Sequence, residues 1–244
     1  MHLAFEQFPA LSAIEICRHV FAQRMPGIEV SDDKAEVLER LDAAHREIRN
    51  ATGFGDWPLF TTEQVHGREI TVIEQVGSAL RADRRRRGAA SLHREFPACD
   101  GIITNQRGIA LGIYVADCCA VYIVDPKTPA IGLVHSGRKG TELGVVTNAI
   151  RKMTEGFGSD PANMIVQLSP CIRPPHYEVD FAAEIIRQCR ALCVQHIHDS
   201  GTCTACDLHR YYSYRAEKGK TGRMLAVLGL DPLIANLVGK QPNQ

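Results

Sequence analysis

Two histidines and one cysteine stand where the sequence predicts that strands of a buried sheet end. His66 precedes a glycine at a predicted turn, Cys118 follows the apolar run 109–115, and His135 closes the run 130–134. Strand ends of a buried sheet commonly present side chains to one crevice. Two imidazoles and one thiolate suit a borderline-soft ion such as Zn²⁺, and an open fourth position is typical of a catalytic site. The three residues therefore form a candidate metal centre.

The residue types alone leave other interpretations open. Three ligands in distant segments have no local signature, and a single histidine at a strand end is more often a hydrogen-bonded structural residue. Cys118 with His135 could also be a nucleophile and its base without any metal. Asp117 and Glu63, close in sequence to two of the candidate ligands, could orient a ligand or carry a proton.

The composition is that of a globular protein without an obvious polymeric partner. Hydrophobic residues make up 45% of the 244 residues and charged residues 23%, which permits a substantial core. The formal net charge is zero, so the bulk charge gives no support for nucleic acid or an anionic membrane as a partner. No apolar run approaches the roughly 20 residues of a membrane span, and the first residues lack an export-signal pattern. A cytoplasmic protein is expected, in which the nine cysteines are free thiols rather than disulfides.

The elements that would position the candidate ligands are a mixture of strands and helices. Helical spacing of apolar residues predicts helices over 32–48, 141–153 and 181–194. Two strands are expected on either side of the His66-Gly67 turn, and apolar runs between turn residues predict further strands over 13–23, 101–104, 109–115, 120–124, 130–134, 164–168 and 224–230. Together they predict an α/β fold, a single domain over 1–244 with one or more central mixed β-sheets flanked by helices.

Two other segments attract attention. The arginine-rich stretch 81–94 has no interleaved aromatic residues, which favours a solvated surface loop over a nucleic-acid site. Cys203 and Cys206 have the C-x-x-C spacing of many zinc sites, and with Cys189 and Cys193 they could form a second, structural site. The 189/193 pair lies on an apolar predicted helix, where free cysteines are common core residues, so both interpretations stay open.

Seven short motifs follow one another along the chain. They are HVFAQR (19–24), QVHG (64–67), CDGIIT (99–104), ADCCAV (116–121), VHSGRKG (134–140), LSPCIRPPHYEV (168–179) and SYRAEKGKTGRM (213–224). In this order they resemble the YfiH family, also called laccase-like or multicopper polyphenol oxidase domain proteins. The resemblance implies a fold similar to that of cysteine hydrolases and deamidases. It also implies a metal site formed by the histidine of QVHG, the cysteine of ADC and the histidine of HSG, which are His66, Cys118 and His135.

The function implied by this resemblance is purine nucleoside chemistry: phosphorolysis of adenosine, inosine or methylthioadenosine, with adenosine deamination as a second activity. The expected partners are a small nucleoside and phosphate, and the expected cofactor is Zn²⁺ rather than copper. True laccase chemistry is not expected, because the chain has ten histidines but a single H-x-H pair, too few for a trinuclear copper cluster. The expected residues are His66, Cys118, His135 and Asp117 for catalysis, and Arg24, Gln64, Lys139, Tyr177 and Arg215 for substrate binding.

The sequence departs from the family pattern in ways that keep other functions open. Where relatives usually have HAGWRG, residues 135–140 read HSGRKG, so Lys139 replaces a planar, bidentate arginine. The segment 177–203 is shorter than in relatives, as if a helix-and-strand section of theirs were missing, and the arginine-rich stretch 81–94 looks like an insertion. The alternatives are a cysteine-dependent hydrolase that edits peptidoglycan precursors and a metal-binding protein without catalytic activity.

Overall fold

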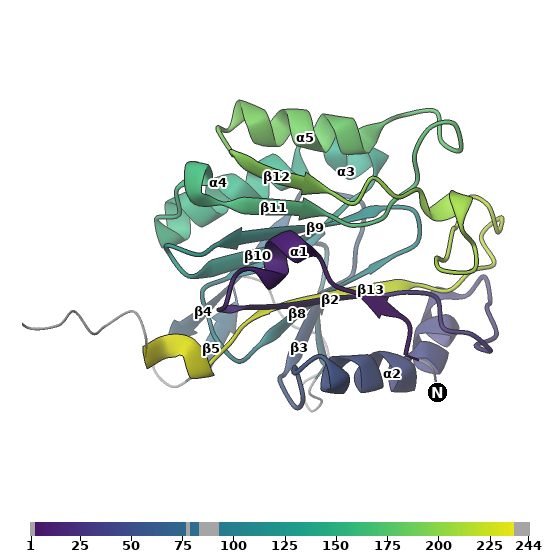
Figure 1. The fold of residues 1–244 in the computed structure, drawn as a ribbon, viewed down its shortest axis with the longest axis horizontal. Helices are drawn as coiled ribbons and strands as arrows, with labels where there is room; N and C mark the ends of the chain where they lie inside the picture. The colour runs from purple at the N-terminus through teal and green to yellow at the C-terminus, as the bar shows by residue number, and fades with distance from the viewer. Residues whose placement is uncertain (1–2, 77–78, 83–92, 237–244) are drawn as a thin grey trace, which may run out of the picture.

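Two β-sheets stacked face to face form the centre of the protein, with helices on both outer faces (Figure 1). The computed structural model describes residues 3–76, 79–82 and 93–236. Val20 and Leu228 of one sheet share a hydrophobic core with Tyr122 of the other. The Tyr122 hydroxyl donates a hydrogen bond to the Val20 carbonyl oxygen at 2.9 Å, since a fully buried phenol needs a polar partner. The sheets are thus joined by apolar packing and by at least this hydrogen bond.

One sheet has six strands in the order β1-β2-β13-β8-β3-β6. Strand β3 is parallel to β6 and β8, and the other neighbours are antiparallel, so the sheet is mixed. Its strands are β1 (Phe5–Glu6), β2 (Cys17–Ala22), β3 (Leu59–Thr62), β6 (His93–Phe96), β8 (Ala110–Val115) and β13 (Met224–Leu230).

The other sheet has seven strands in the order β12-β11-β9-β10-β7-β4-β5 and is also mixed, because β4–β7 and β11–β12 are parallel pairs. Its strands are β4 (Ile70–Val76), β5 (Ala79–Ala82), β7 (Gly101–Thr104), β9 (Cys119–Asp125), β10 (Ala130–Ser136), β11 (Ile165–Leu168) and β12 (His196–Asp199). Strands β9 and β10 are completely buried, which explains their continuous apolar runs.

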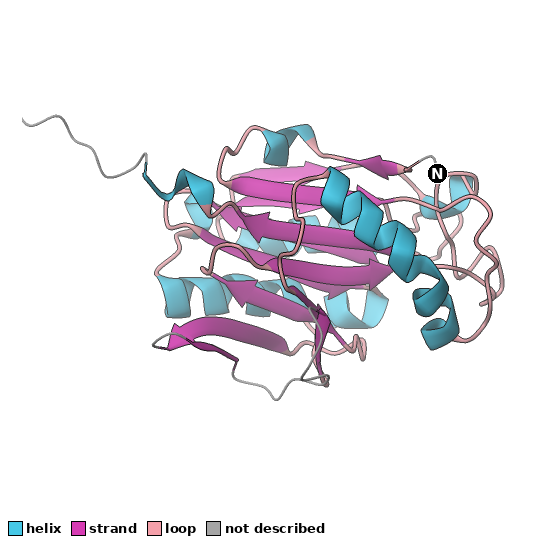
Figure 2. Ribbon diagram, turned by 90° about the horizontal axis from the view of Figure 1, so that it is seen from below, coloured by secondary structure: helices cyan, strands magenta, loops and turns pink. Residues whose placement is uncertain are grey.

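Helices cover the outer face of each sheet. Helix α2 (Lys34–Ala51) crosses the six-stranded sheet, as Figure 2 shows from below, and begins where the Asp33 carboxylate accepts hydrogen bonds from two backbone amides. Along β9, Tyr122 faces the core between the sheets, whereas Val121 faces α4 (Val145–Phe157) and α5 (Phe181–Ala191) on the other side. The remaining helices are α1 (Pro9–Ser12) and α3 (Arg138–Glu142), and the 3-10 turns are η1 (Pro161–Asn163), η2 (Thr204–Cys206) and η3 (Leu233–Asn236).

The predicted α/β class with mixed sheets flanked by helices is confirmed, but several boundaries are wrong. The helix expected over 141–153 is two helices, α3 and α4, because Gly144 between them has a φ of 73°, which breaks the helical path. The strand expected over 13–23 begins only at Cys17. The segment 177–203 holds α5, where a helix was expected, and β12, which was not expected.

Two further expectations, on the arginine-rich loop and on membrane spans, are compared with the described residues alone. The arginine-rich loop lies outside them over 83–92, and its flanks belong to β5 and β6. Within the described part of the chain, no helix combines the length and the apolar character that crossing a membrane requires.

Candidate metal centre and its cavity

The structure brings His66, Cys118 and His135 together from three separate segments of the chain. His66 lies between β3 and β4, and Cys118 lies between β8 and β9, so both follow the chain as it passes from one sheet to the other. His135 is the penultimate residue of β10. One donor atom from each residue lies within 4.8 Å of the other two, and the two imidazole rings meet edge to face at 4.8 Å. The two crossings and the end of β10 therefore converge on one point.

The carboxylate of Asp100 holds two of these residues in place. Its Oδ1 lies 2.9 Å from Nδ1 of His135 and accepts the backbone N–H of His66 at 2.8 Å, while its Oδ2 accepts the N–H of Gly67 at 2.7 Å. Because Nδ1 of His135 is bound to Asp100, the other ring nitrogen, Nε2, is the one that can bind a metal ion or a proton. A carboxylate behind a ligating histidine fixes the tautomer and ring orientation in many metal sites. Asp100 stands in the CDG motif but was not among the residues predicted from the sequence.

The backbone around the cluster adopts conformations that L-residues rarely take. Gln64, His66 and Asp117 have φ angles of 61°, 59° and 82°. Non-glycine residues in the left-handed region carry strain and often mark functional sites, because the surrounding contacts must hold them there. At His66, the carboxylate of Asp100 supplies such a contact by binding the N–H groups of residues 66 and 67.

Gly137 leaves room beside the sulfur of Cys118. The last residue of β10, Ser136, pairs with the first residue of β9, Cys119. This register places the residue after β10, Gly137, against the residue before β9, Cys118. A Cβ atom added to Gly137 would lie 2.5 Å from the Cys118 Sγ and 3.8 Å from a ring carbon of His66. The glycine is needed because of this close approach, not because of an unusual φ, which is −98°.

Charges in the cluster favour a thiolate. Burial alone raises the pKa of Cys118, but the neighbouring His135 and hydrogen bonds from His135 and His66 lower it to about 6. Burial alone lowers the pKa of His135, but the Cys118 thiolate and Asp100 raise it to about 9. Burial also raises the pKa of Asp100, yet hydrogen bonds from His135, Gly67 and His66 hold it below its ordinary value. The thiolate is the form of cysteine that both ligates metals and attacks electrophiles.

Replacing Asp100 with asparagine is expected to weaken metal binding about 10- to 100-fold, the usual effect of removing a carboxylate behind a ligating histidine. Asparagine keeps the shape of the side chain but no longer stabilises a positively polarised His135 ring. Competition with a coloured chelator measures the affinity, and the thermal transition shows whether the variant is folded. A folded Asp100→Asn protein with unchanged affinity would contradict this role.

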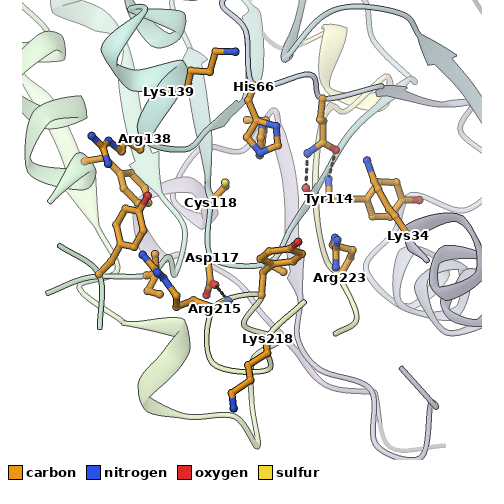
Figure 3. A pocket seen from close by; sticks show the side chains of 17 residues that line it. Lys34, His66, Tyr114, Asp117, Cys118, Arg138, Lys139, Arg215, Lys218 and Arg223 are labelled. Atoms are coloured by element: carbon orange, nitrogen blue, oxygen red, sulfur yellow. Dashed lines mark hydrogen bonds between the residues drawn. The ribbon is translucent and has the colours of Figure 1, made fainter. Parts of the chain in front are cut away.

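The cluster lies in the wall of a cavity of about 810 Å³, a size typical of small-molecule sites. Six basic side chains line it, whereas Asp117 is the acid among the described lining residues. Figure 3 shows Lys34 and Arg223 on one side of Cys118, and Arg138 and Arg215 on the other. Aromatic side chains contribute a further part of the wall. They are Tyr114, Tyr177, Phe181 and Tyr214. The cavity therefore combines an excess of positive charge with flat apolar surfaces.

Of the other residues expected at the site, Gln64 and Asp117 line the cavity but are engaged by the protein itself. The Gln64 amide forms two hydrogen bonds with the backbone of Tyr114. The Asp117 carboxylate accepts hydrogen bonds from the Thr204 hydroxyl and from the backbone N–H of Arg215, both at 2.7 Å. Both side chains thus hold neighbouring segments in position.

Lys139, Tyr177 and Arg215 also line the cavity. The Arg215 guanidinium lies 4.9 Å from the centre of the Tyr177 ring and binds Glu178. Arg24 is not brought to the cavity: its guanidinium binds Glu217 and lies over the ring of Tyr212.

Glu63 lies outside the cavity as well, and its carboxylate accepts the backbone N–H of Ala98. The lining residues that the sequence did not single out include Lys34, Tyr214 and Arg223. The last two stand inside the motif SYRAEKGKTGRM, which was the available signal. Lys34 gave none, because it reads as an ordinary residue in the first turn of a helix.

The chain is similar in sequence to known proteins over most of its length. The chain matches the family model described as multi-copper polyphenol oxidoreductase laccase over residues 15–189 and 179–231. It is 26% identical over 247 residues to the purine nucleoside phosphorylase YlmD of Geobacillus stearothermophilus, covering 86% of this chain and 84% of that protein. It is 28% identical over 231 residues to the purine nucleoside phosphorylase ORF3 of Streptomyces griseus, with coverages of 84% and 86%.

Solved structures show the same fold. The crystal structure of YlmD from Geobacillus stearothermophilus superposes with a TM-score of 0.76 at 22% identity, covering 94% of this chain and 99% of that one. The Bacillus licheniformis protein YfiH gives a TM-score of 0.72 at 21% identity, with coverages of 88% and 93%.

Proposed function

The chain belongs to the multi-copper polyphenol oxidoreductase laccase family, the YfiH family, and from this premise we propose that it is a zinc-dependent purine nucleoside phosphorylase. The observation that carries the proposal is the cationic, aromatic-lined cavity around His66, Cys118 and His135. Phosphorolysis needs a site that holds an anion beside a ribose while the purine departs. Relatives at 26–28% identity bear the name purine nucleoside phosphorylase.

Lys34 and Arg223 are the side chains best placed to hold phosphate. Burial lowers the pKa of Lys34, and the positive charge of Arg223 lowers it further. The negative charges of Glu95, Asp100 and Glu63 act in the opposite direction. Two cations that repel each other at one wall of a cavity are stabilised when an anion lies between them. Arg223 uses one nitrogen to bind two backbone carbonyls, which fixes the direction of its planar fork. Lys139, which also lines the cavity, is a second place for an anion.

The aromatic side chains suit the purine. Tyr214 is 55% exposed although its ring lines the cavity, so one face is open to a stacking partner. Tyr177 packs edge to face on Phe181 and lies under Arg215, which makes it a rigid part of the wall. Stacking of a base on an aromatic ring contributes about 1–3 kcal/mol and tolerates different bases. The cavity can therefore accept adenosine, inosine or methylthioadenosine.

The residues present fit a zinc ion. Two imidazoles and a thiolate are the donors that this ion prefers with an open fourth position, and Gly137 keeps the space beside Cys118 clear. His66, Cys118 and His135 would hold the ion, with Asp100 orienting His135. When bound, Zn²⁺ supplies a Lewis acid that stabilises developing negative charge. Around it, Lys34 and Arg223 would neutralise the phosphate, and the aromatic walls would exclude water from the reacting sugar.

Phosphorolysis is favoured over deamination by the groups around the cluster. A zinc deaminase uses an acidic residue to shuttle a proton to the leaving amine. Asp117 is the acid among the described lining residues, and both of its oxygens already accept hydrogen bonds from Thr204 and Arg215. The basic walls, by contrast, match a phosphate substrate. Deamination of adenosine is therefore proposed as at most a secondary activity.

The test of this function is base release from adenosine, inosine and methylthioadenosine, each with and without phosphate. Phosphorolysis releases free base only when phosphate is present, and hydrolysis releases it in both cases. Deamination converts adenosine to inosine and ammonia without releasing base. Base release that does not respond to phosphate with any of the three nucleosides would overturn the proposal.

Replacing Lys34 with alanine is expected to raise the KM for phosphate about tenfold or more, because a hydrogen bond to a charged group is lost. The KM for nucleoside should change much less. Lys127→Ala is the matched control, since Lys127 is an exposed lysine in the turn between β9 and β10. If Lys139→Ala raises the phosphate KM and Lys34→Ala does not, phosphate binds at Lys139 instead.

One observation favours a second candidate, a cysteine-dependent hydrolase. Cys118, His135 and Asp100 are arranged as a nucleophile, a base and the carboxylate that orients the base. The same His135 nitrogen that would bind a metal would then take a proton from the thiol. Peptidoglycan precursors are the substrates that the family resemblance suggests for such a hydrolase.

The pH dependence of Cys118 alkylation measures the thiolate directly. Because its pKa is lowered to about 6, the thiolate is present above pH 6 and lost below it, whereas an unperturbed thiol has a pKa of about 8.5. In chelator-treated protein, iodoacetamide should therefore label Cys118 at a rate that rises through about pH 6. Exposed Cys193 serves as the reference thiol within the same digest. Equal pH profiles for both cysteines would contradict the thiolate–imidazolium pair.

A further inference from the structure

Three metal-binding side chains meet at a second place in the protein, outside the cavity wall. The Sγ atoms of Cys203 and Cys206 lie 3.7 Å and 3.5 Å from Nδ1 of His176, and the three donor atoms all lie within 4.8 Å of one another. The C-x-x-C pair thus has a histidine partner that its sequence spacing did not reveal. Cys189 and Cys193 do not join it: Cys189 is buried in the core on α5, and Cys193 is exposed beyond the end of that helix.

The distances fit a tetrahedral ion. With Zn–S bonds of about 2.3 Å and Zn–N bonds of about 2.0–2.1 Å, neighbouring ligand atoms around tetrahedral zinc are about 3.5–3.8 Å apart. The two sulfur–nitrogen distances match this spacing without any movement of the side chains. Hydrogen bonds alone fit less well, because a neutral imidazole nitrogen has one lone pair and two sulfurs approach it. A shared cation satisfies both sulfurs and the nitrogen at once.

Both segments that carry the donors are fixed by their own contacts. The backbone N–H of His176 donates to the carbonyl oxygen of Arg173. The guanidinium of Arg173 in turn binds the carboxylate of Asp199. The backbone of Cys203 pairs with Cys171, and the N–H of Thr204 donates to the carbonyl oxygen of Cys171 at 3.2 Å. The donors are therefore held in place by the fold, which lowers the entropic cost of binding an ion.

We propose that His176, Cys203 and Cys206 bind one thiophilic divalent cation, with Zn²⁺ the ion that the donor set favours, independently of the cluster at Cys118. His176 and Cys206 are exposed, so the fourth position faces solvent and the ion can enter from outside. The proposal does not depend on the enzymatic function.

Such an ion would tie together two segments that contact the cavity. Tyr177, which lines the cavity, directly follows His176. Thr204, between the two cysteines, donates to Asp117, which directly precedes Cys118. The expected role is structural, because the ion would cross-link the 173–177 turn to the 203–206 turn. Its removal should therefore lower the melting temperature of the whole chain.

Zinc titration of the reduced full-length chain tests the proposal in a Cys118→Ala background, which removes a ligand of the other cluster. We expect one Zn²⁺ per chain to bind, to be lost in the additional Cys203→Ser/Cys206→Ser variant, and to bind at least tenfold more weakly after His176→Ala. Cys193→Ser and His209→Ala, which change an exposed thiol and an exposed imidazole outside the cluster, should leave binding unchanged.

A second readout uses the unmutated protein, so that it does not depend on the folding of any variant. Zn²⁺ should protect Cys203 and Cys206 from alkylation, as peptide mass spectrometry measures for each thiol, while Cys193 remains reactive. The proposal is overturned if Zn²⁺ leaves both cysteines as reactive as before. It is also overturned if the Cys118→Ala protein binds zinc equally well with and without Cys203 and Cys206.

Discussion

Replacing Cys118 with alanine is expected to remove the metal of the cavity and phosphorolysis together, with kcat/KM falling on the order of 10²–10³-fold or more. Cys118 supplies the thiolate of the three-donor cluster, and its lowered pKa of about 6 keeps that charge at neutral pH. Without it, two imidazoles remain, a set that binds zinc much more weakly. Elemental analysis of purified protein and base release in the presence of phosphate measure both effects on one sample.

A matched thiol control separates this effect from a general loss of cysteine. Cys193→Ser removes an exposed thiol away from the cavity and should keep full metal content and activity. The thermal transition of Cys118→Ala shows whether the variant is folded. Turnover that persists in folded Cys118→Ala protein that has lost the metal of the cavity would mean that neither the zinc mechanism nor a Cys118 nucleophile is correct.

Adding a single methyl group at Gly137 is expected to have an effect of similar size. The new Cβ of Gly137→Ala would lie 2.5 Å from the Cys118 Sγ, closer than any real contact, so either the sulfur or the turn before α3 must move. The backbone angles of Gly137, φ −98° and ψ −172°, are open to alanine, so the backbone itself need not be strained. We expect metal binding and base release to fall together.

Gly156→Ala is the matched glycine control. Gly156 lies in the last turn of α4, and nothing lies within 4 Å of an added Cβ. Alanine is favoured over glycine in a helix, by roughly 0.5–1 kcal/mol in the helix interior. This variant should keep metal and activity and melt slightly higher. If Gly137→Ala binds metal as tightly as the unmutated protein, the position beside Cys118 is not where the ion lies.

Much of the scaffold was predictable because its strands are buried on both faces. Continuous apolar runs marked β9, β10 and β13, and helical spacing marked α2 and α5. Short exposed elements carried no such pattern, and β12, with its sequence HIHD, was missed for that reason. The division into two sheets could not be read from the runs, since a crossing between sheets and a turn within one sheet have the same local signals.

The candidate ligands were predictable from motifs, but their partners were not. Asp100 touches His66 and His135 only because β7 lies between β4 and β10, a fact of topology that no single motif contains. Arg24 shows the opposite case: its motif matched the family, yet the fold pairs it with Glu217 away from the cavity. His176 meets Cys203 because two turns distant in sequence lie side by side.

Phosphate-dependent base release by the same protein before and after metal removal separates zinc-dependent phosphorolysis from every metal-free reaction. The chelator-treated protein, shown by elemental analysis to be free of metal, is assayed with inosine or adenosine and then reloaded with Zn²⁺. Free base and ribose phosphate are expected only when zinc and phosphate are both present. Equal base release by the metal-free protein, or release that does not need phosphate, would contradict this expectation.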